Sequence, residues 1–271
     1  MKKTINKYLR KFGFEIKKTN TNKISFYNDY GYEIGYEFEK EANEAIKVVR
    51  KNTMLPYVNL ITLYEQIFFC EKNRIKGDFV ECGVWKGGAV GLMAIANLKH
   101  GFSRRHLHLF DSFEGICAPN EDLDGERAIK EVKQNLGIKA LTKGELIPLK
   151  GFYDQFGGPG NINECQNLID KIIKYPSDFV HYYKGWFQDT LPIKSNDIEK
   201  IAILRLDGDW YESTKVCLEY LFDKVVSGGF IIIDDYGLYK GCKKAVDEYL
   251  EKNRMRYYLN YSSWACRYII K

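Results

Sequence analysis

Three aspartates directly follow two strongly apolar runs, an arrangement that could support metal chemistry. Asp207 comes after residues 201–206, and Asp234 and Asp235 come after residues 230–233. If the two runs are neighbouring parallel strands, these carboxylates converge at one edge of a sheet, where they repel one another unless a cation lies among them. Carboxylate oxygens suit Mg²⁺ or another hard divalent cation. Loop caps or solvated acids are the simpler alternative, but they do not readily explain an Asp-Asp pair directly after three isoleucines.

Residues 78–89 have the pattern of a strand, a tight glycine turn and the start of a helix. Gly83 lets a ligand approach the backbone, and free N–H groups at the helix start near Gly87 suit an anionic group. Glu81 lies at the carboxyl end of the strand, where it can bind an ammonium or a hydroxyl. Asp111 ends the next strand, where Rossmann-like proteins hold a ribose diol. A plain turn and a helix cap remain alternatives for the two motifs taken singly.

Trp85 and Lys86 stand where the dinucleotide-binding pattern G-x-G-x-x-G has small residues. This departure disfavours a pyrophosphate cradle for NAD. It favours S-adenosylmethionine, which has no phosphates.

The elements that must position these residues alternate along the chain. Strand-length apolar runs occupy residues 79–80, 106–110, 179–183, 201–206 and 230–233, followed by β-like runs at 256–261 and 264–270. Helical periodicity covers residues 57–72, 87–99, 213–226 and 240–252. The pattern predicts an α/β, Rossmann-like fold with a mainly parallel seven-stranded sheet, helices on both faces and an antiparallel C-terminal edge hairpin. Ser213 is expected to cap its helix, and Gly228 and Gly229 to end it.

Residues 114–178 separate the second and third strands and are too long for one crossover helix. Insertions of this length in compact domains are usually functional loops, lids or disordered segments. The aromatic residues Phe152, Tyr153 and Phe156 favour an ordered cover over the substrate.

The net charge of +5 is concentrated at the N-terminus, because residues 1–18 carry seven cations and one acid. The remainder is nearly neutral, which argues against nucleic-acid binding. Ile5, Tyr8, Leu9 and Phe12 form an apolar stripe, so a short basic helix could contact an anionic membrane surface or a partner enzyme. A helix packed on its own domain is the alternative.

Cysteine usage and hydropathy bear on the compartment. The seven cysteines form no C-x-x-C pair, no apolar run approaches the length of a membrane span, and the start lacks a secretory signal. We expect a cytoplasmic protein, with the basic arm offering peripheral contact at the inner membrane surface. A homo-oligomer is one of the states the sequence leaves open.

Five blocks in order resemble the macrocin and mycinamicin sugar O-methyltransferases (the TylF/MycF family). The blocks are residues 81–88 (ECGVWKGG), 110–115 (FDSFEG), 185–192 (GWFQDTLP), 205–209 (RLDGD) and 234–236 (DDY). The resemblance covers roughly residues 50–252. It implies a class I methyltransferase domain, which we place at residues 21–271. The basic arm at 1–20 and the substrate-covering insertion at about 114–178 show no usable match to the family and rest on charge and segment length.

The resemblance also implies site residues, an S-adenosylmethionine cofactor and Mg²⁺. Implied cofactor contacts are Thr53, Met54, Glu81, Gly83, Asp111, Ser112 and Trp186. Asp207, Asp234 and Asp235 are implied as metal ligands, and Asp209 as the general base. A buried core tryptophan explains Trp186 equally well.

The implied function is Mg²⁺-dependent methylation of a sugar hydroxyl on a glycoside, a nucleotide sugar or a polysaccharide precursor. Because the insertion shapes the acceptor pocket and shows no usable match, the residues do not identify the sugar. The alternatives are an O-methyltransferase of a catechol or other small diol, and a catalytically silent relative that binds a sugar or a partner. The intact set of aspartates argues against a silent relative.

Overall fold

The computed structural model describes residues 37–137 and 142–271. The predicted basic arm at residues 1–20 lies outside the described residues. Within the described part, no helix has both the length and the apolar character that a membrane span requires.

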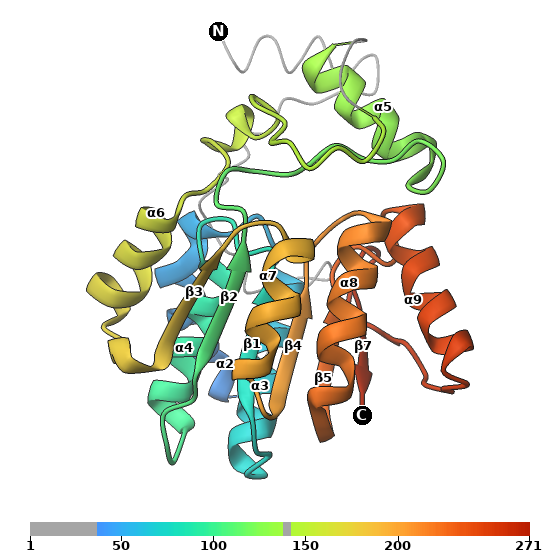
Figure 1. Cartoon of the computed structure of the whole chain (residues 1–271). Helices are drawn as coiled ribbons and strands as arrows, with labels where there is room; N and C mark the ends of the chain where they lie inside the picture. The colour runs from blue at the N-terminus through green and yellow to red at the C-terminus, as the bar shows by residue number, and fades with distance from the viewer. Residues whose placement is uncertain (1–36, 138–141) are drawn as a thin grey trace, which may run out of the picture. The chain divides into compact units, whose positions relative to one another are not determined.

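A seven-stranded sheet forms the centre of the fold, with strand order β3-β2-β1-β4-β5-β7-β6 (Figure 1). The strands are β1 (Asp78–Cys82), β2 (Leu107–Asp111), β3 (Val180–Lys184), β4 (Ile201–Leu206), β5 (Val225–Ile233), β6 (Asn260–Tyr261) and β7 (Arg267–Ile270). The first five strands pair in parallel, whereas β7 runs antiparallel to both β5 and β6. The predicted mainly parallel sheet with an antiparallel C-terminal edge is confirmed.

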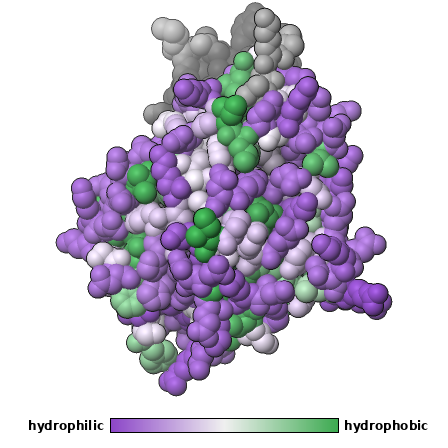
Figure 2. Space-filling view, viewed as in Figure 1, coloured by the Kyte–Doolittle hydropathy of each residue, from purple (hydrophilic) through white to green (hydrophobic). Residues whose placement is uncertain are grey.

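Helices cover both faces of this sheet. The α-helices of the described residues are α2 (Glu37–Val49), α3 (Tyr57–Lys72), α4 (Gly88–His100), α5 (Gly125–Leu136), α6 (Ile162–Gln166), α7 (Phe187–Lys194), α8 (Tyr211–Leu221) and α9 (Lys240–Lys252). Figure 1 shows α7, α8 and α9 on one face and α3 and α4 on the other. The first of these faces is mainly hydrophilic on its outer side, with separate hydrophobic residues (Figure 2). Every residue of β4 is buried, as expected for a central parallel strand.

Two details of the predicted elements were wrong. Helix α8 begins at Tyr211 rather than Ser213, because the carboxylate of Asp124 accepts the Tyr211 N–H at 2.7 Å and takes the role of the cap. Gly228 and Gly229 lie inside β5. There Gly228 adopts a φ of 80°, and the pairing between β4 and β5 shifts register.

The long segment between β2 and β3 contains folded structure. It holds α5, and α6 continues into a π-helical stretch at Asn167–Ile173. Figure 1 shows α5 beyond the carboxyl ends of the strands, while α6 lies beside β3. Its role as a substrate cover stays a prediction.

Gly83 allows β1 and β4 to approach each other at the site. Its φ is 91°, and a Cβ on this residue would lie 1.8 Å from the carbonyl oxygen of Asp207. The Asp207 N–H in turn donates to the Cys82 carbonyl at 2.8 Å. The absence of a side chain at Gly83 therefore lets the acidic turn after β4 pack on the glycine turn after β1.

We predict that Gly83→Ala destabilises the protein by more than the positive φ alone explains. Gly158→Ala is the matched control, since Gly158 has a φ of 97° and its Cβ would meet nothing within 4 Å. Overpacking costs ~1–3 kcal/mol, so Gly83→Ala should unfold at lower denaturant concentration than Gly158→Ala. Equal midpoints for the two variants would contradict the close approach.

Candidate active site

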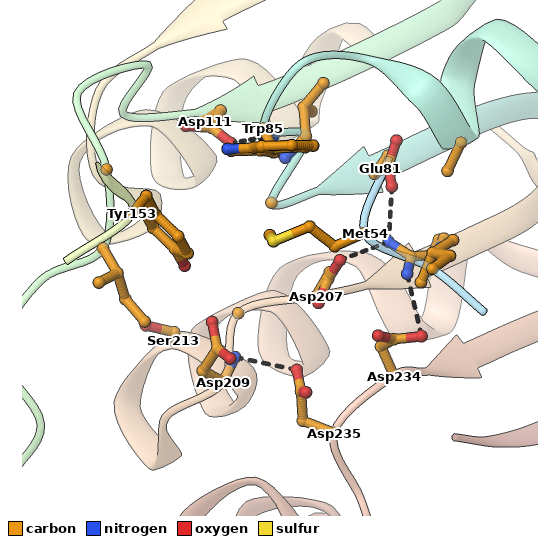
Figure 3. Close-up of a pocket in the computed structure, with 18 of the residues that line it drawn as sticks. Met54, Glu81, Trp85, Asp111, Tyr153, Asp207, Asp209, Ser213, Asp234 and Asp235 are labelled. Carbon is orange, nitrogen blue, oxygen red and sulfur yellow. Dashed lines mark hydrogen bonds and ion pairs between the residues drawn. The ribbon is translucent and has the colours of Figure 1, made fainter. Parts of the chain in front are cut away.

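A cavity of about 330 Å³ opens at the carboxyl ends of the parallel strands. All the predicted site residues line it: Thr53, Met54, Glu81, Gly83, Asp111, Ser112, Trp186, Asp207, Asp209, Asp234 and Asp235. Figure 3 shows Asp111 and Trp85 on one side, the four aspartates that follow β4 and β5 on the opposite side, and Met54 pointing between them.

Arg205 is the buried cation around which the acidic side is built. Its side chain is only 2% exposed. One guanidinium nitrogen, Nη1, lies 2.6 Å from Glu81 Oε1 and 2.8 Å from Asp207 Oδ2, and Nη2 lies 2.9 Å from Asp234 Oδ1. Strand register explains this cluster, because Glu81 on β1 is the pairing partner of Arg205 on β4 and Asp207 follows two residues later.

Asp207, Asp234 and Asp235 each contribute an oxygen to one compact group. One carboxylate oxygen from each residue lies within 4.8 Å of the other two. Arg205 contacts Oδ2 of Asp207 and Oδ1 of Asp234, so the same guanidinium holds two members of the group. The convergence that the sequence predicted is present.

Burial and mutual repulsion favour the neutral forms of these acids. Burial raises the pKa of Asp234 to about 6, against the opposing effect of Arg205. Burial, followed by the charges of Asp209 and Asp207, raises the pKa of Asp235 well above its usual range. Burial also raises the pKa of Glu81 to about 8, because the loss of hydration outweighs the ion pair with Arg205. One guanidinium does not balance this many carboxylates, so the site attracts further positive charge.

Asp209 lies next to the group without belonging to it. Its backbone adopts a φ of 57°, and its N–H donates to Asp235 Oδ2 at 3.3 Å. Burial raises the pKa of its carboxyl well above the usual range, and Asp207 and Asp234 add to the shift. Figure 3 shows the carboxylate directed into the cavity, on the side of Tyr153.

Glu81 lines the cavity and keeps one buried oxygen unpaired. Its Oε1 is paired with Arg205, whereas its Oε2 is buried without a hydrogen-bond partner. A buried carboxylate oxygen without a partner is costly. A positively charged or hydroxyl-bearing group in the cavity would satisfy it.

Asp111 is already engaged by the backbone of the surrounding turns. Its Oδ2 accepts N–H groups from Val84 and Trp85 at 2.6 and 3.0 Å, and its Oδ1 accepts that of Phe113 at 2.6 Å. Val84 and Trp85, which precede the helix start, therefore have their N–H groups engaged, whereas Gly87 at the helix start, where free N–H groups were expected, has no side-chain cap. Ser112 likewise donates to the Gly115 carbonyl at 2.6 Å.

Trp85 ties the long insertion to the glycine turn. Its indole N–H donates to the Gly158 carbonyl at 3.0 Å, and the Lys86 ammonium donates to the Gly157 carbonyl at 2.8 Å. The Cys165 thiol donates to the Trp85 carbonyl at 3.2 Å. These contacts hold the segment that carries Tyr153 against the cavity.

Several cavity residues had no role in the sequence analysis. They include Glu131, Leu238, Tyr239, the turn Ser263–Ala265, and Arg205, which stood in a family motif without a function of its own. A cation inside the apolar run of residues 201–206 was a usable signal for Arg205, because a buried charge requires partners. The other residues come from elements distant in sequence, and only the folded chain brings them together.

Comparisons with known proteins agree with this geometry. The chain is 37% identical over 181 residues to a demethyldecarbamoylnovobiocin O-methyltransferase of Streptomyces niveus, covering 66% of this chain and 60% of that protein. It is 34% identical over 179 residues to an 8-demethyl-8-(2,3-dimethoxy-alpha-L-rhamnosyl)-tetracenomycin-C 4'-O-methyltransferase of Streptomyces olivaceus, covering 65% and 59%. The match thus spans about 60% of the length of each of these two relatives.

Solved structures show the same fold. The O-methyltransferase NovP superposes with a TM-score of 0.63 at 29% identity, covering 81% of this chain and 82% of that one. The calicheamicin methyltransferase CalS11, with a TM-score of 0.52 at 17% identity, covers 92% and 98%. The fold is therefore the Rossmann-like fold of class I methyltransferases. The model of the Macrocin-O-methyltransferase (TylF) family matches residues 40–143 and 171–271, and the chain belongs to that family.

Proposed function

We propose that this protein methylates a hydroxyl of a sugar with S-adenosylmethionine and a divalent cation. The observation that carries the proposal is the convergence of Asp207, Asp234 and Asp235 beside Asp209, in the same cavity as the cofactor residues. When bound, S-adenosylmethionine supplies a methyl group on a sulfonium, and a hard divalent cation lowers the pKa of a hydroxyl that it binds.

The proposed cofactor residues bind different parts of S-adenosylmethionine, according to the chemistry of their side chains. The unpaired Oε2 of Glu81 suits the ammonium of the methionine end, and Gly83 lines the cavity beside it. Asp111 would use its remaining acceptor capacity for ribose hydroxyls, with Ser112 adjacent. A further set of residues, Thr53, Met54 and Trp186, would supply the walls.

The acidic group of Asp207, Asp234 and Asp235 offers the oxygen ligands that a hard cation prefers. Three carboxylates offer oxygen ligands within 4.8 Å of one another, which is the ligand type of Mg²⁺ sites. Asp207 and Asp234 are held by Arg205, which reduces the conformational freedom that they would lose on binding a metal.

Asp209 would accept the proton of the attacking hydroxyl. A general base must be anionic, and burial together with the neighbouring acids opposes that form. Asp209 would regain its anionic form when Asp207, Asp234 and Asp235 bind a cation, because the positive charge offsets the repulsion between the carboxylates. The proton thus moves from the hydroxyl oxygen to Asp209 as the new oxygen–carbon bond forms and the carbon–sulfur bond breaks.

Sugar as the acceptor class is supported by the names of the relatives. One is named for the 4'-O-methylation of a tetracenomycin compound that carries an α-L-rhamnosyl unit. Another, 28% identical over 221 residues, is a mycinamicin III 3''-O-methyltransferase of Micromonospora griseorubida. A screen of glycosides, nucleotide sugars and catechols with labelled S-adenosylmethionine, read by mass spectrometry, tests the class. Labelling of catechols alone would contradict it.

We predict that Asp209→Asn abolishes most turnover while preserving ligand binding. Loss of a positioned general base costs ~10²–10⁴-fold in rate, and the amide nearly matches the carboxylate in shape. Turnover and affinities for S-adenosylhomocysteine and Mg²⁺ should be measured beside Asp207→Asn, which should weaken Mg²⁺ binding. Near-normal turnover of Asp209→Asn at neutral pH would place the base elsewhere.

We predict that the metal-free protein loses stability as pH rises from about 5 to 8. Asp234, with a pKa of about 6, and Asp235 hold protons in the folded state at pH values where the unfolded chain, with Asp pKa values near ~3.9, has released them. The folded state therefore binds more protons in this range, and its stability falls as pH increases. Mg²⁺ should raise the melting temperature more at pH 8 than at pH 5.

The control for this pH dependence is Asp235→Asn, which should flatten the metal-free slope because it removes one of the titrating acids. Thermal unfolding is followed with and without chelator. An equal effect of Mg²⁺ at pH 5 and pH 8 would contradict the assignment of the acidic group.

We predict that Asp111→Ala lowers both stability and cofactor affinity. The change removes the acceptor of three backbone N–H groups and, as proposed, of ribose hydroxyls. Such bonds contribute ~1.5–3 kcal/mol, or about one to two decades in the dissociation constant of S-adenosylhomocysteine.

Asp124→Ala is the matched control for Asp111→Ala. Asp124 is also buried and accepts the N–H groups of Asn120 and Tyr211, but it does not line the cavity. It should lower the melting temperature alone. If Asp111→Ala behaves in the same way, Asp111 serves only to cap the turns.

A further inference from the structure

Trp264 exposes a large aromatic ring at the cavity. It lies in the turn between β6 and β7, lines the cavity, and is 59% exposed. Trp210, by contrast, is buried in the core. Keeping an indole in water forgoes the free energy that its burial would release, so the exposure of Trp264 calls for an explanation other than packing.

The turn that carries Trp264 is fixed to the acidic group. Gly237, two residues after Asp235, donates its N–H to the Ala265 carbonyl at 2.7 Å. A Cβ at Gly237 would lie 2.1 Å from the Trp264 carbonyl oxygen, so the two backbones touch. Arg267 also donates to the Ser263 carbonyl at 2.6 Å. The indole is therefore placed by the same chain turn that places Asp235.

The strand order puts Trp264 on the far side of the acidic group from the cofactor residues. Asp111 ends β2 and Glu81 lies on β1, the proposed metal ligands follow β4 and β5, and Trp264 belongs to the next pair, β7 and β6. A hydroxyl attacking the methyl group must reach the acids from the side that the cofactor does not occupy. Trp264 stands on that side.

Helix α5 completes this part of the cavity. The guanidinium of Arg127 lies 5.5 Å from the centroid of the Trp264 ring, which holds the ring in orientation. Glu131, one turn later, accepts the Tyr239 hydroxyl at 2.8 Å. Trp264, Tyr239 and Glu131 thus combine an aromatic ring with hydrogen-bonding groups, the set that a sugar requires.

The charge of the lining residues indicates whether the ligand is neutral or anionic. Of the described residues that line the cavity, Arg205 is the single cation, and it already contacts Glu81, Asp207 and Asp234. Arg127, next to the Trp264 ring, does not line the cavity, so a phosphate inside the cavity would mainly meet carboxylates. An uncharged sugar would meet an aromatic face, whose negative potential attracts the slightly positive C–H groups of a pyranose ring.

We propose that Trp264 binds the acceptor by stacking on the apolar face of an uncharged hexose unit, carried as a glycoside rather than as a sugar phosphate. This assignment rests on the proposed sugar O-methylation and adds the residue and the charge class of the acceptor. Trp264 acts as a specificity residue, and removal of the hydroxyl proton remains the role of Asp209.

The test is a ligand-observed NMR titration of protein loaded with S-adenosylhomocysteine and Mg²⁺. The probes are methyl α-L-rhamnopyranoside, which has neighbouring hydroxyls and an apolar methyl group, and glucose 1-phosphate. We expect Trp264→Ala to raise the dissociation constant of the rhamnoside at least about tenfold, and Trp264→Phe to change it less than about threefold. Tyr258→Ala, which removes an aromatic ring 81% exposed outside the cavity, should leave it unchanged.

S-adenosylhomocysteine affinity should be the same in all four proteins, since Trp264 lies away from the cofactor residues. Equal rhamnoside binding by wild type and Trp264→Ala, no rhamnoside binding by the loaded wild type, or tighter binding of glucose 1-phosphate would each overturn the assignment. A wild type that fails to bind S-adenosylhomocysteine would instead overturn the proposed function, so the two failures are distinguishable.

Discussion

The ion pairs of Arg205 are the interaction on which the site depends. A guanidinium 2% exposed would be very unfavourable without partners, and its three carboxylates come from β1, the end of β4 and the end of β5. Removing one partner of a buried pair typically costs ~3–5 kcal/mol, so Arg205 fixes the relative positions of three strand ends. The acids exceed the cation in number. The same cluster that organises the sheet edge therefore leaves a net negative charge that a divalent cation would balance.

The other parts of the site are arranged around this edge. Gly83 permits β1 and the turn after β4 to touch. The Asp111 carboxylate accepts the N–H groups of Val84 and Trp85, in the turn after β1. Trp85 and Lys86 anchor the insertion that carries Tyr153. On the opposite side, Gly237 brings the β6–β7 turn against the end of β5. Each close approach is made by backbone or by a buried polar side chain, so small errors in strand register would separate the groups.

The apolar periodicity of the sequence, together with the residues that mark the ends of strands and helices, predicted most of the fold. The apolar runs placed the residues at the ends of β1, β2, β4 and β5 in one cavity, because the ends of parallel strands share an edge, whereas Thr53, Met54 and Trp186 came from the family resemblance alone. Long-range contacts were beyond this reasoning. Ser213 was expected to cap its helix, but the helix start at Tyr211 is capped by Asp124, a residue of the distant insertion. No pattern in the sequence indicated that Asp111 accepts the N–H groups of Val84 and Trp85. Trp264 is distant in sequence from every motif, and only the antiparallel pairing of β7 with β5 brings it to the site.

The most direct test of this account is the number of protons released when Mg²⁺ binds. Burial and mutual repulsion raise the pKa of Asp209 and of Asp235 and so favour their protonated forms in the metal-free protein, and a cation that binds the carboxylates favours loss of these protons. Calorimetric titration with Mg²⁺ at neutral pH, in two buffers of different ionisation enthalpy, measures this release. The account predicts one bound ion per chain with release of about one proton or more. Binding without proton release, or no binding at millimolar Mg²⁺, would contradict it.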